Sequence, residues 1–258
     1  MGDLIKITDG KYKLYEDLLI KRDVLYKEAE SIHIAYVCEF GELLLKAFEL
    51  KVGCIKKKKM IAICQVAVNR GDSIDVQDMN NKIAKSMAVY EAQLLNMVRE
   101  KEFADKSKIS APYKVERAKR AYHRLAKLIH PDINPLTKEN TDLMDLWERI
   151  KIAYYVNDDE ELDELEVLVR RILKDNNIDV VVPHVDNIEA RIDKLQAEIN
   201  DIVTSEPYIY SALLSSPERI EARKEEIYKD IADYEEYGAK LSKILQQLLS
   251  EGGAILTC

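Results

Sequence analysis

Apolar residues recur at intervals of three and four along most of the chain, which is the period of amphipathic helices. From Lys11 to about Leu50 this pattern predicts one long helix. A break is expected near Gly53, followed by a second helix that ends at Arg70 before the turn-forming residues 71–73. A third helix follows, with a seam typical of a helix that packs on other helices, made of Ile83, Met87, Tyr90, Leu94 and Met97.

A shorter helical hairpin is predicted after the polar loop 106–112. Its first helix is expected over residues 113–129. Its second helix carries one apolar face, made of Leu143, Leu146, Trp147, Ile150, Ala153 and Tyr154. A further helix begins in the acidic stretch 158–166, because carboxylates suit a helix N-terminus, and the Val-Val-Val-Pro run at 180–183 predicts an extended linker.

Heptad spacing characterises the rest of the chain. It runs from Ile188 to Ile202 and again from Ile227 to Leu248, and it predicts an antiparallel coiled-coil hairpin joined by residues 205–216. The second arm, from Pro217 to about Ser250, is nearly twice as long as the first. Its surplus apolar residues therefore need cover from the N-terminal helices or from a second copy in a homodimer. The connection offers a candidate contact patch of Tyr208, Ile209, Tyr210, Leu213 and Leu214.

The composition agrees with an all-α fold of long helices. Pro and Gly are scarce, with six and eight copies, and charged residues make up 33% of the chain. We expect long N-terminal helices over residues 1–84, the hairpin region over 85–178, and the linker with the C-terminal coiled-coil hairpin over 179–258.

Charge and cysteine usage narrow the function classes. The net charge of −8 would repel a phosphate backbone, so nucleic-acid binding is not expected unless a local basic patch exists. The run Lys56–Lys59 is interpreted as a solvated charge run, with contact to nucleic acid or anionic lipid as the alternative. The four cysteines form no C-x-x-C pair, and no apolar run approaches about 18 residues, which predicts a cytoplasmic protein with reduced thiols and no membrane partner.

Catalytic and metal chemistry is not indicated. His33, His123 and His184 have no acidic or thiol neighbours at ligand spacing, so we expect no metal site. The sequence also has no nucleophile motif and no phosphate-binding glycine loop. We therefore expect a protein that is not an enzyme and has no cofactor.

The candidate chemistry lies in the helix over residues 113–129 and the loop after it. This helix holds six Lys or Arg against the single Glu116, and it places Arg117, Arg120, Arg124 and Lys127 opposite its apolar side of Val115, Ala118, Tyr122, Leu125 and Ile129. Pro131 biases His130 away from helical angles, so Asp132 is expected at an exposed loop tip. Taken alone, the basic face could be only a solvated surface and His130 only a helix-terminating residue.

The residues of this segment also carry a family resemblance. The sequences Lys119-Arg120-Ala121-Tyr122, Leu125-Ala126, His130-Pro131-Asp132, Asn134-Pro135 and Ala153-Tyr154 together resemble the J-domain of DnaJ-type co-chaperones. The resemblance covers about residues 85 to 170 and is strongest from 115 to 156. The chain resembles a divergent member, without a Gly/Phe-rich linker or a cysteine-rich zinc module.

Two kinds of departure from the family pattern stand out. The first-helix signature is missing, so we expect residues around Leu94, Leu95 and Val98 to replace that helix. His123, Ile129 and Ile133 stand where the family has a basic residue, an aromatic residue and a basic residue.

The resemblance implies a co-chaperone that docks on a DnaK-type ATPase chaperone and stimulates ATP hydrolysis, with the flanking helices selecting a client or complex. It assigns partner binding to His130, Pro131, Asp132, Lys119, Tyr122, Arg124 and Asn134. The alternative is a structural coiled-coil interaction scaffold in which the J-like hairpin is silent.

Overall fold

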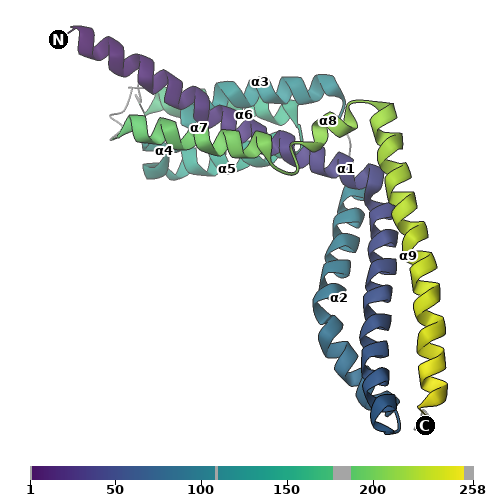
Figure 1. The fold of residues 1–258 in the computed structure, drawn as a ribbon. Helices are drawn as coiled ribbons and strands as arrows, with labels where there is room; N and C mark the ends of the chain where they lie inside the picture. Colours follow the sequence, from purple (N-terminus) through teal and green to yellow (C-terminus); the bar gives the residue numbers. More distant parts are fainter. Residues whose placement is uncertain (1, 108–109, 177–186, 253–258) are drawn as a thin grey trace. The chain divides into compact units, whose positions relative to one another are not determined.

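The structure is a computed structural model that describes residues 2–107, 110–176 and 187–252, with side chains from residue 10 onward. Within these residues the chain is helical and has no β-strand, which confirms the all-α fold class (Figure 1). It divides into two compact units. Unit 1 comprises Met1–Ile32 and Lys108–Ile209, and unit 2 comprises His33–Ser107 and Tyr210–Cys258.

Helix α1 (Gly2–Arg70) runs through both units without a break. The predicted interruption near Gly53 is therefore wrong. A helical glycine costs only about 1 kcal/mol relative to alanine, and burial of the neighbouring Cys54 offsets that cost. The helix ends at Arg70, and the following Gly71 adopts a positive φ of 72° and donates its N–H to the carbonyl of Val68.

Unit 1 contains the predicted hairpin. Its helices are α3 (Pro112–Ile129), the short α4 (Leu136–Glu139), α5 (Thr141–Tyr155), α6 (Asp159–Asp175) and α7 (Ile188–Thr204). Asn140 and Asp158 cap α5 and α6 by accepting backbone hydrogen bonds from Leu143 and Glu161. The predicted linker at 180–183 lies outside the described residues.

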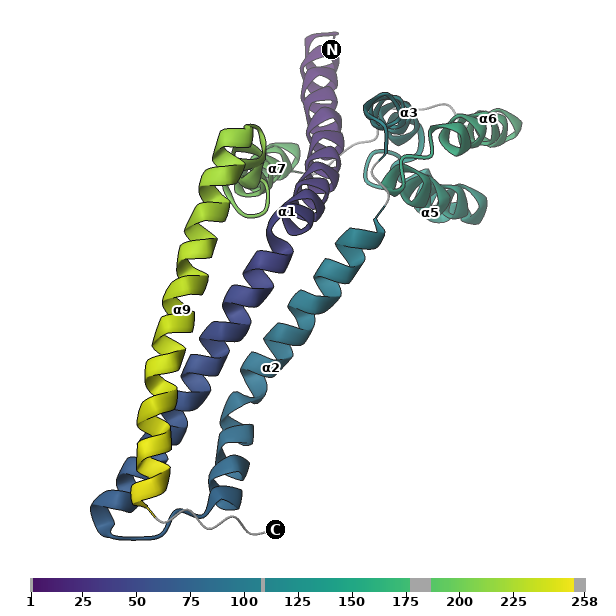
Figure 2. The same ribbon diagram turned by 90° about the vertical axis from the view of Figure 1, so that its right-hand side faces the viewer.

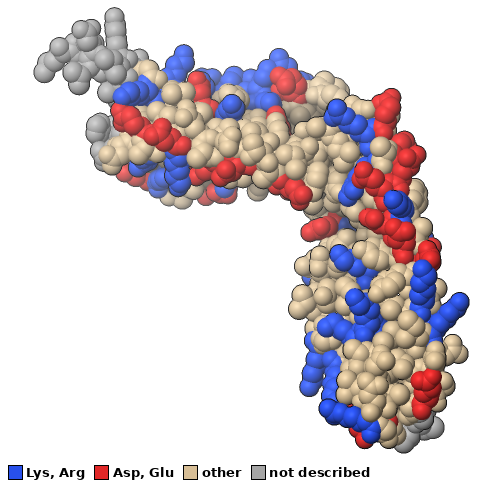
Figure 3. All heavy atoms as spheres, in the orientation of Figure 1, with Lys and Arg blue, Asp and Glu red and all other residues tan. Residues whose placement is uncertain are grey.

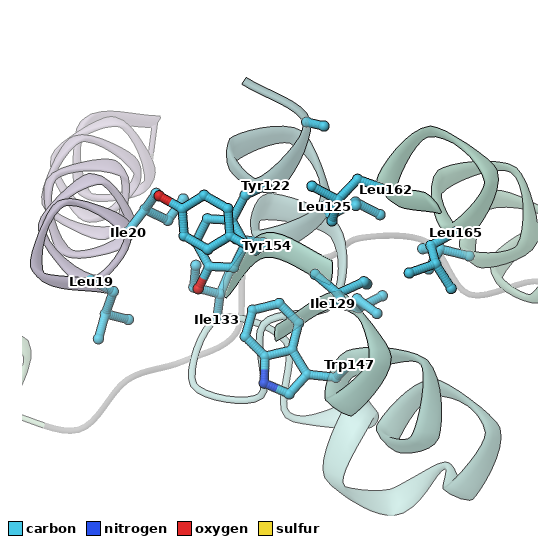
Figure 4. Close-up of a cluster of buried hydrophobic side chains, with 14 of the residues drawn as sticks. Leu19, Ile20, Tyr122, Leu125, Ile129, Ile133, Trp147, Tyr154, Leu162 and Leu165 are labelled. Atoms are coloured by element: carbon cyan, nitrogen blue, oxygen red, sulfur yellow. The ribbon is translucent and has the colours of Figure 1, made fainter. Parts of the chain in front are cut away.

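The first part of α1 completes the core of unit 1. Leu19 and Ile20 of α1 lie against Tyr122, Tyr154 and Ile133, while α6 packs on the other side of the hairpin through Leu162 and Leu165 (Figure 4). All of these side chains belong to one buried cluster with Trp147.

The expectation that residues around Leu94, Leu95 and Val98 supply the missing first helix is wrong, because those residues belong to unit 2. The predicted boundary at residue 84 does not coincide with a division between the two units, and the predicted boundary at 178 lies outside the described residues. Both α1 and α2 carry apolar faces of suitable period, and the sequence pattern does not say which of them the hairpin buries.

Unit 2 is a bundle of three long helices that lie side by side in both ribbon views (Figure 2). It consists of the remainder of α1, α2 (Val76–Lys106), the short α8 (Tyr210–Leu214) and α9 (Pro217–Glu251). None of the helices in the described part of the chain is long and apolar enough to cross a bilayer. Buried Phe40 packs with Ile227 and Ile231 of α9, and Leu248 packs with α1 and α2 around Cys64.

The predicted C-terminal hairpin is corrected by these contacts. The seam of α7 is buried against α1, where Ile199 and Ile202 meet Leu25 and Ala29. The seam of α9 also uses α1. Heptad spacing identifies a stripe that must be covered but does not identify its partner, and here α1 covers both stripes.

The N-terminal region thus supplies the cover that the longer arm was expected to need, since Leu245 and Leu248 pack in unit 2. The candidate contact patch is largely used within the chain as well. Leu213 and Leu214 pack around Phe40, and the ring of Tyr210 stacks on Tyr36 with centroids 4.1 Å apart.

The identity of the helix that completes unit 1 can be tested with the single tryptophan, Trp147, which reports on the core of that unit. Ile20 is fully buried there, so Ile20→Ala should lower the free energy of unfolding by about 2–5 kcal/mol in urea titrations followed by Trp147 fluorescence. Leu95→Ala is the control, because Leu95 is 49% exposed, and it should change this transition by less than about 0.5 kcal/mol. A larger loss of unfolding free energy in Leu95→Ala than in Ile20→Ala would show instead that α2 supplies the first helix of the hairpin unit.

Candidate functional site

The loop after α3 is a tight turn built around the backbone of His130. The His130 N–H donates to the carbonyl of Ala126 and ends the helix. The His130 carbonyl then accepts from the N–H groups of Ile133 and Asn134, at 2.9 and 2.7 Å. The loop therefore has a defined backbone shape before any partner is considered.

The ring of His130 is held on three sides. Its Nδ1 accepts a hydrogen bond from the backbone N–H of Asp132 at 3.0 Å, which leaves the ring proton on Nε2. That nitrogen lies 3.3 Å from a carboxylate oxygen of Asp23 in α1. The ring also meets Trp147 edge-on, with centroids 4.8 Å apart. With 5% of its surface exposed, His130 shapes the loop from inside.

Asp132 is the acidic group that the loop presents to solvent. Its side chain is 44% exposed and accepts a hydrogen bond from Lys138 at 2.9 Å. Partial burial raises the pKa of Asp132, but the hydrogen bond from Lys138 and nearby positive charge outweigh it, so the pKa lies below its usual value. Asp132 is therefore a carboxylate at neutral pH.

Asn134 and Ile133 face inward. The Asn134 amide donates to the carbonyl of Leu128 at 3.0 Å and accepts from the N–H of Leu136 at 3.2 Å, which ties both ends of the loop together. Ile133 is buried against α1, and its carbonyl accepts from the hydroxyl of Tyr12 at 2.6 Å. An apolar residue at position 133, where the family has a basic one, fits this burial.

Tyr122 also faces α1 instead of solvent. Only 3% of its surface is exposed, its ring stacks on Tyr154 at 4.1 Å, and its hydroxyl donates to Asp23 at 2.9 Å. The Asp23 carboxylate thus interacts with the Tyr122 hydroxyl, the His130 ring and the guanidinium of the adjacent Arg22. Burial raises the pKa of Asp23, but the hydrogen bond with His130 and the charge of Arg22 bring it below its usual value.

Sequence reasoning missed Asp23, although a signal was available. At 100° per residue, Asp23 falls between Leu19 and Ile20 on the helical wheel, on the apolar side of α1. A carboxylate at such a position must find hydrogen-bonding partners when the face is buried.

The basic side chains of α3 are paired with acids on both flanks. Toward α1, Lys119 pairs with Glu28 at 2.8 Å, and toward α6, Arg124 pairs with Glu166 at 2.8 Å. Arg120 differs, because it pairs only with Glu116 of its own helix at 3.7 Å and is 65% exposed. The most accessible cation of this face is therefore Arg120.

The chemistry that this arrangement offers is the binding of a partner by its accessible charged groups. Asp132 and Arg120 remain accessible, whereas His130, Asn134 and Tyr122 are buried and hold the loop and helix in place. Among the described residues, no three His, Cys, Asp or Glu side chains gather in a way that could hold a metal ion.

No protein-family model, curated protein or solved structure gives a significant match to this chain. The functional assignment therefore depends on the chain's own residues and on the sequence resemblance in α3 and its loop.

The role of Asp23 can be measured through stability and its pH dependence. Asp23→Asn should lower the free energy of unfolding by about 1–3 kcal/mol at pH 7, because buried donors lose their charged acceptor. A carboxyl group with a lowered folded pKa stabilises above its unfolded pKa, and that stability is lost as the pH falls past the ordinary value of 3.8. The wild type should therefore lose more stability than Asp23→Asn between pH 5 and pH 3, again by Trp147 fluorescence.

Asp17→Asn is the matched control, because Asp17 pairs with Lys127 at the same helix but is 47% exposed. It should have little effect at either pH. Equal effects of the two substitutions would show that Asp23 is only another surface charge.

Proposed function

We propose that this protein is a co-chaperone that docks on a DnaK-type ATPase chaperone through the loop 130–134 and the outer face of α3, and stimulates its ATP hydrolysis. The observation that carries the proposal is the presentation of Asp132. Its carboxylate stands exposed on a loop whose backbone is fixed from inside by His130 and Asn134. Such a pre-organised acid loses little conformational entropy when it receives a two-pronged arginine from a partner.

Asp132 can exchange its partner at low cost. The pair with Lys138 is solvent-exposed, and exposed pairs of this kind contribute only about 0–1 kcal/mol. A chaperone arginine can therefore replace Lys138 without a large penalty. Arg120 and Arg124, on the outer face of α3, would attract an acidic surface of the ATPase domain during encounter.

The docking footprint proposed here is narrower than the resemblance implies. Tyr122 is buried under α1, and Lys119 pairs with Glu28 of α1. We therefore assign contact to Asp132, Arg120 and Arg124, and positioning of the loop to His130, Pro131 and Asn134. Tyr122 and Lys119 are assigned to the contact with α1.

The flanking helices are proposed to direct the co-chaperone to a client or complex. The cytoplasm suits this assignment, because DnaK-type chaperones work there and thiols such as those of Cys54 and Cys64 stay reduced.

A second candidate is an interaction scaffold whose J-like hairpin is silent. The burial of Tyr122, His130 and Asn134 within unit 1 favours it, because these side chains are already used to hold the fold. Steady-state ATPase assays with a purified DnaK separate the two functions, since a scaffold leaves ATP turnover at its basal rate.

The central test is Asp132→Asn in the full-length protein. The substitution removes an exposed charge without opening the core, so the circular dichroism and Trp147 fluorescence of the protein should not change. The docking contact it removes is worth about 2–5 kcal/mol, which should abolish stimulation at concentrations where the wild type is active. Asp145→Asn, at an exposed carboxylate of α5, is the control and should stimulate normally. Full stimulation by Asp132→Asn would refute the co-chaperone function.

A second test addresses the basic face. Arg120→Glu should slow association with the ATPase domain about tenfold at low salt and reduce the salt dependence of the rate, because it removes an exposed steering charge. Arg171→Glu, at a position of α6 that is 78% exposed, is the control and should change the rate much less. The association rates of both variants can be measured by stopped-flow or surface plasmon resonance. Equal association rates for the two variants would show that this face of α3 is only a solvated surface.

A further inference from the structure

One end of the helical bundle in unit 2 is strongly basic, although the whole chain is acidic. Between residues 51 and 70, α1 contains six basic residues and no acidic residue. The stretches 79–90 of α2 and 237–250 of α9 add two lysines each and no acid. All three stretches pack into one apolar cluster, so their surfaces adjoin. Figure 3 shows Lys and Arg side chains gathered over the lower half of this bundle, with fewer Asp and Glu among them.

Most of these charges have no acidic partner. Lys57 donates to the carbonyl of Gly238, and Lys82 and Lys240 pair with acids one turn away in their own helices. The remaining seven form no ion pair with any described residue. They are Lys51, Lys56, Lys58, Lys59, Arg70, Lys85 and Lys243.

The contrast with α3 is informative. All six Lys and Arg of α3 are paired with acids of α1, α3 or α6, so each cation of that helix has an acidic partner within the fold. At the end of unit 2, the acids of the turn after α1, Asp72 and Asp75, form no ion pair in the described structure, and Asp75 caps α2 by accepting from the N–H of Asp78. Unpaired like charges repel one another, and a bound polyanion would relieve that repulsion.

The unpaired charges of α1 are organised on one side of the helix. At 100° per residue, Lys51, Lys58, Lys59 and Arg70 fall within about 120° of one another, opposite the buried Cys64. At 1.5 Å per residue they extend over roughly 30 Å. This length is close to one turn of a nucleic-acid duplex, which is about 34 Å.

The side chains between these charges decide which polyanion fits. A helix that binds at a lipid surface needs large apolar residues on its exposed face. On this face of α1 only Val66, 51% exposed, projects among the cations, and the adjoining stretches of α2 and α9 add the isolated Val89 and Ile244. Protein interfaces are poor in lysine and rich in aromatic residues and arginine, whereas this face has one arginine and no aromatic residue. A phosphate backbone requires only positive charges at suitable intervals.

We propose that this basic end of unit 2 binds the phosphate backbone of a nucleic-acid duplex without sequence preference. Single strands fit less well, because binding them uses a series of exposed aromatic rings on which bases stack, and this end offers the single exposed ring of Tyr237 among its described residues. The expectation that nucleic acid is excluded came from the net charge of the whole chain, which hides this local patch. The proposal uses residues of unit 2 and is independent of chaperone docking by unit 1.

The experiment is fluorescence anisotropy of the full-length chain with a labelled DNA duplex of about 20 base pairs, roughly two helical turns. Neutralising four phosphates predicts a slope of about −4 for the logarithm of the association constant against that of the salt concentration. The fourfold variant Lys51→Gln, Lys58→Gln, Lys59→Gln, Arg70→Gln should bind at least about tenfold more weakly at low salt, with a much shallower slope. These side chains form no ion pair in the described structure, so the variant should keep its helical circular dichroism.

A variant with the same loss of charge elsewhere is the control. Lys106, Lys151, Arg171 and Lys194 are all about half exposed or more, and each pairs with an acid three or four residues away in its own helix. Changing these four to Gln should leave duplex binding within about twofold of the wild type, because they lie outside the basic end.

Two further probes complete the design, an RNA duplex of the same length and vesicles containing phosphatidylserine. Binding of either duplex with the predicted salt slope supports the proposal. The duplex that binds more tightly, DNA or RNA, identifies the kind of nucleic acid that this end prefers. The proposal is overturned if the two fourfold variants bind duplex equally, if no duplex binds at low salt, or if vesicles bind and duplexes do not.

Discussion

The fold of unit 1 depends on a half-buried carboxylate, Asp23, that three groups share. The hydroxyl of Tyr122, the ring of His130 and the guanidinium of Arg22 all meet it, so the carboxylate joins α1, α3 and the loop at one point. A carboxylate in this half-buried position would be costly without hydrogen-bonding partners, and the three groups supply them. This interaction fixes the ring that accepts the N–H of Asp132, and so it also fixes the exposed acid of the loop.

Helix α1 gives the molecule its organisation. In unit 1 it covers the hairpin and the seam of α7, and in unit 2 it packs with α2 and α9. A helix this long can serve several partners, because its apolar residues recur along its whole length and different stretches turn different faces to the core. The chain therefore forms interleaved units in which residues distant in sequence share a core.

Two basic helical surfaces of similar composition differ in ion pairing because their surroundings differ. On α3, acids of α1 and α6 pair with the cations and leave Arg120 as the most accessible charge. On α1, Lys51, Lys58, Lys59 and Arg70 lie on one side of the helix and have no acidic partner in the described structure. Counting charges along the sequence treats the two alike, whereas the pairing in space separates a surface balanced within the fold from one that is left free.

The sequence by itself determined the all-α class, most helix positions, the hairpin with its turn at His130 and Pro131, and the exposure of Asp132. These follow from local periodicity and from the backbone restriction that proline imposes. Only the tertiary structure decided which helix completes the hairpin, what covers each heptad seam, and that Tyr122 is buried. An amphipathic period shows that a face must be covered, but the covering surface is chosen by packing among segments far apart in sequence, and local pattern carries no information about that choice.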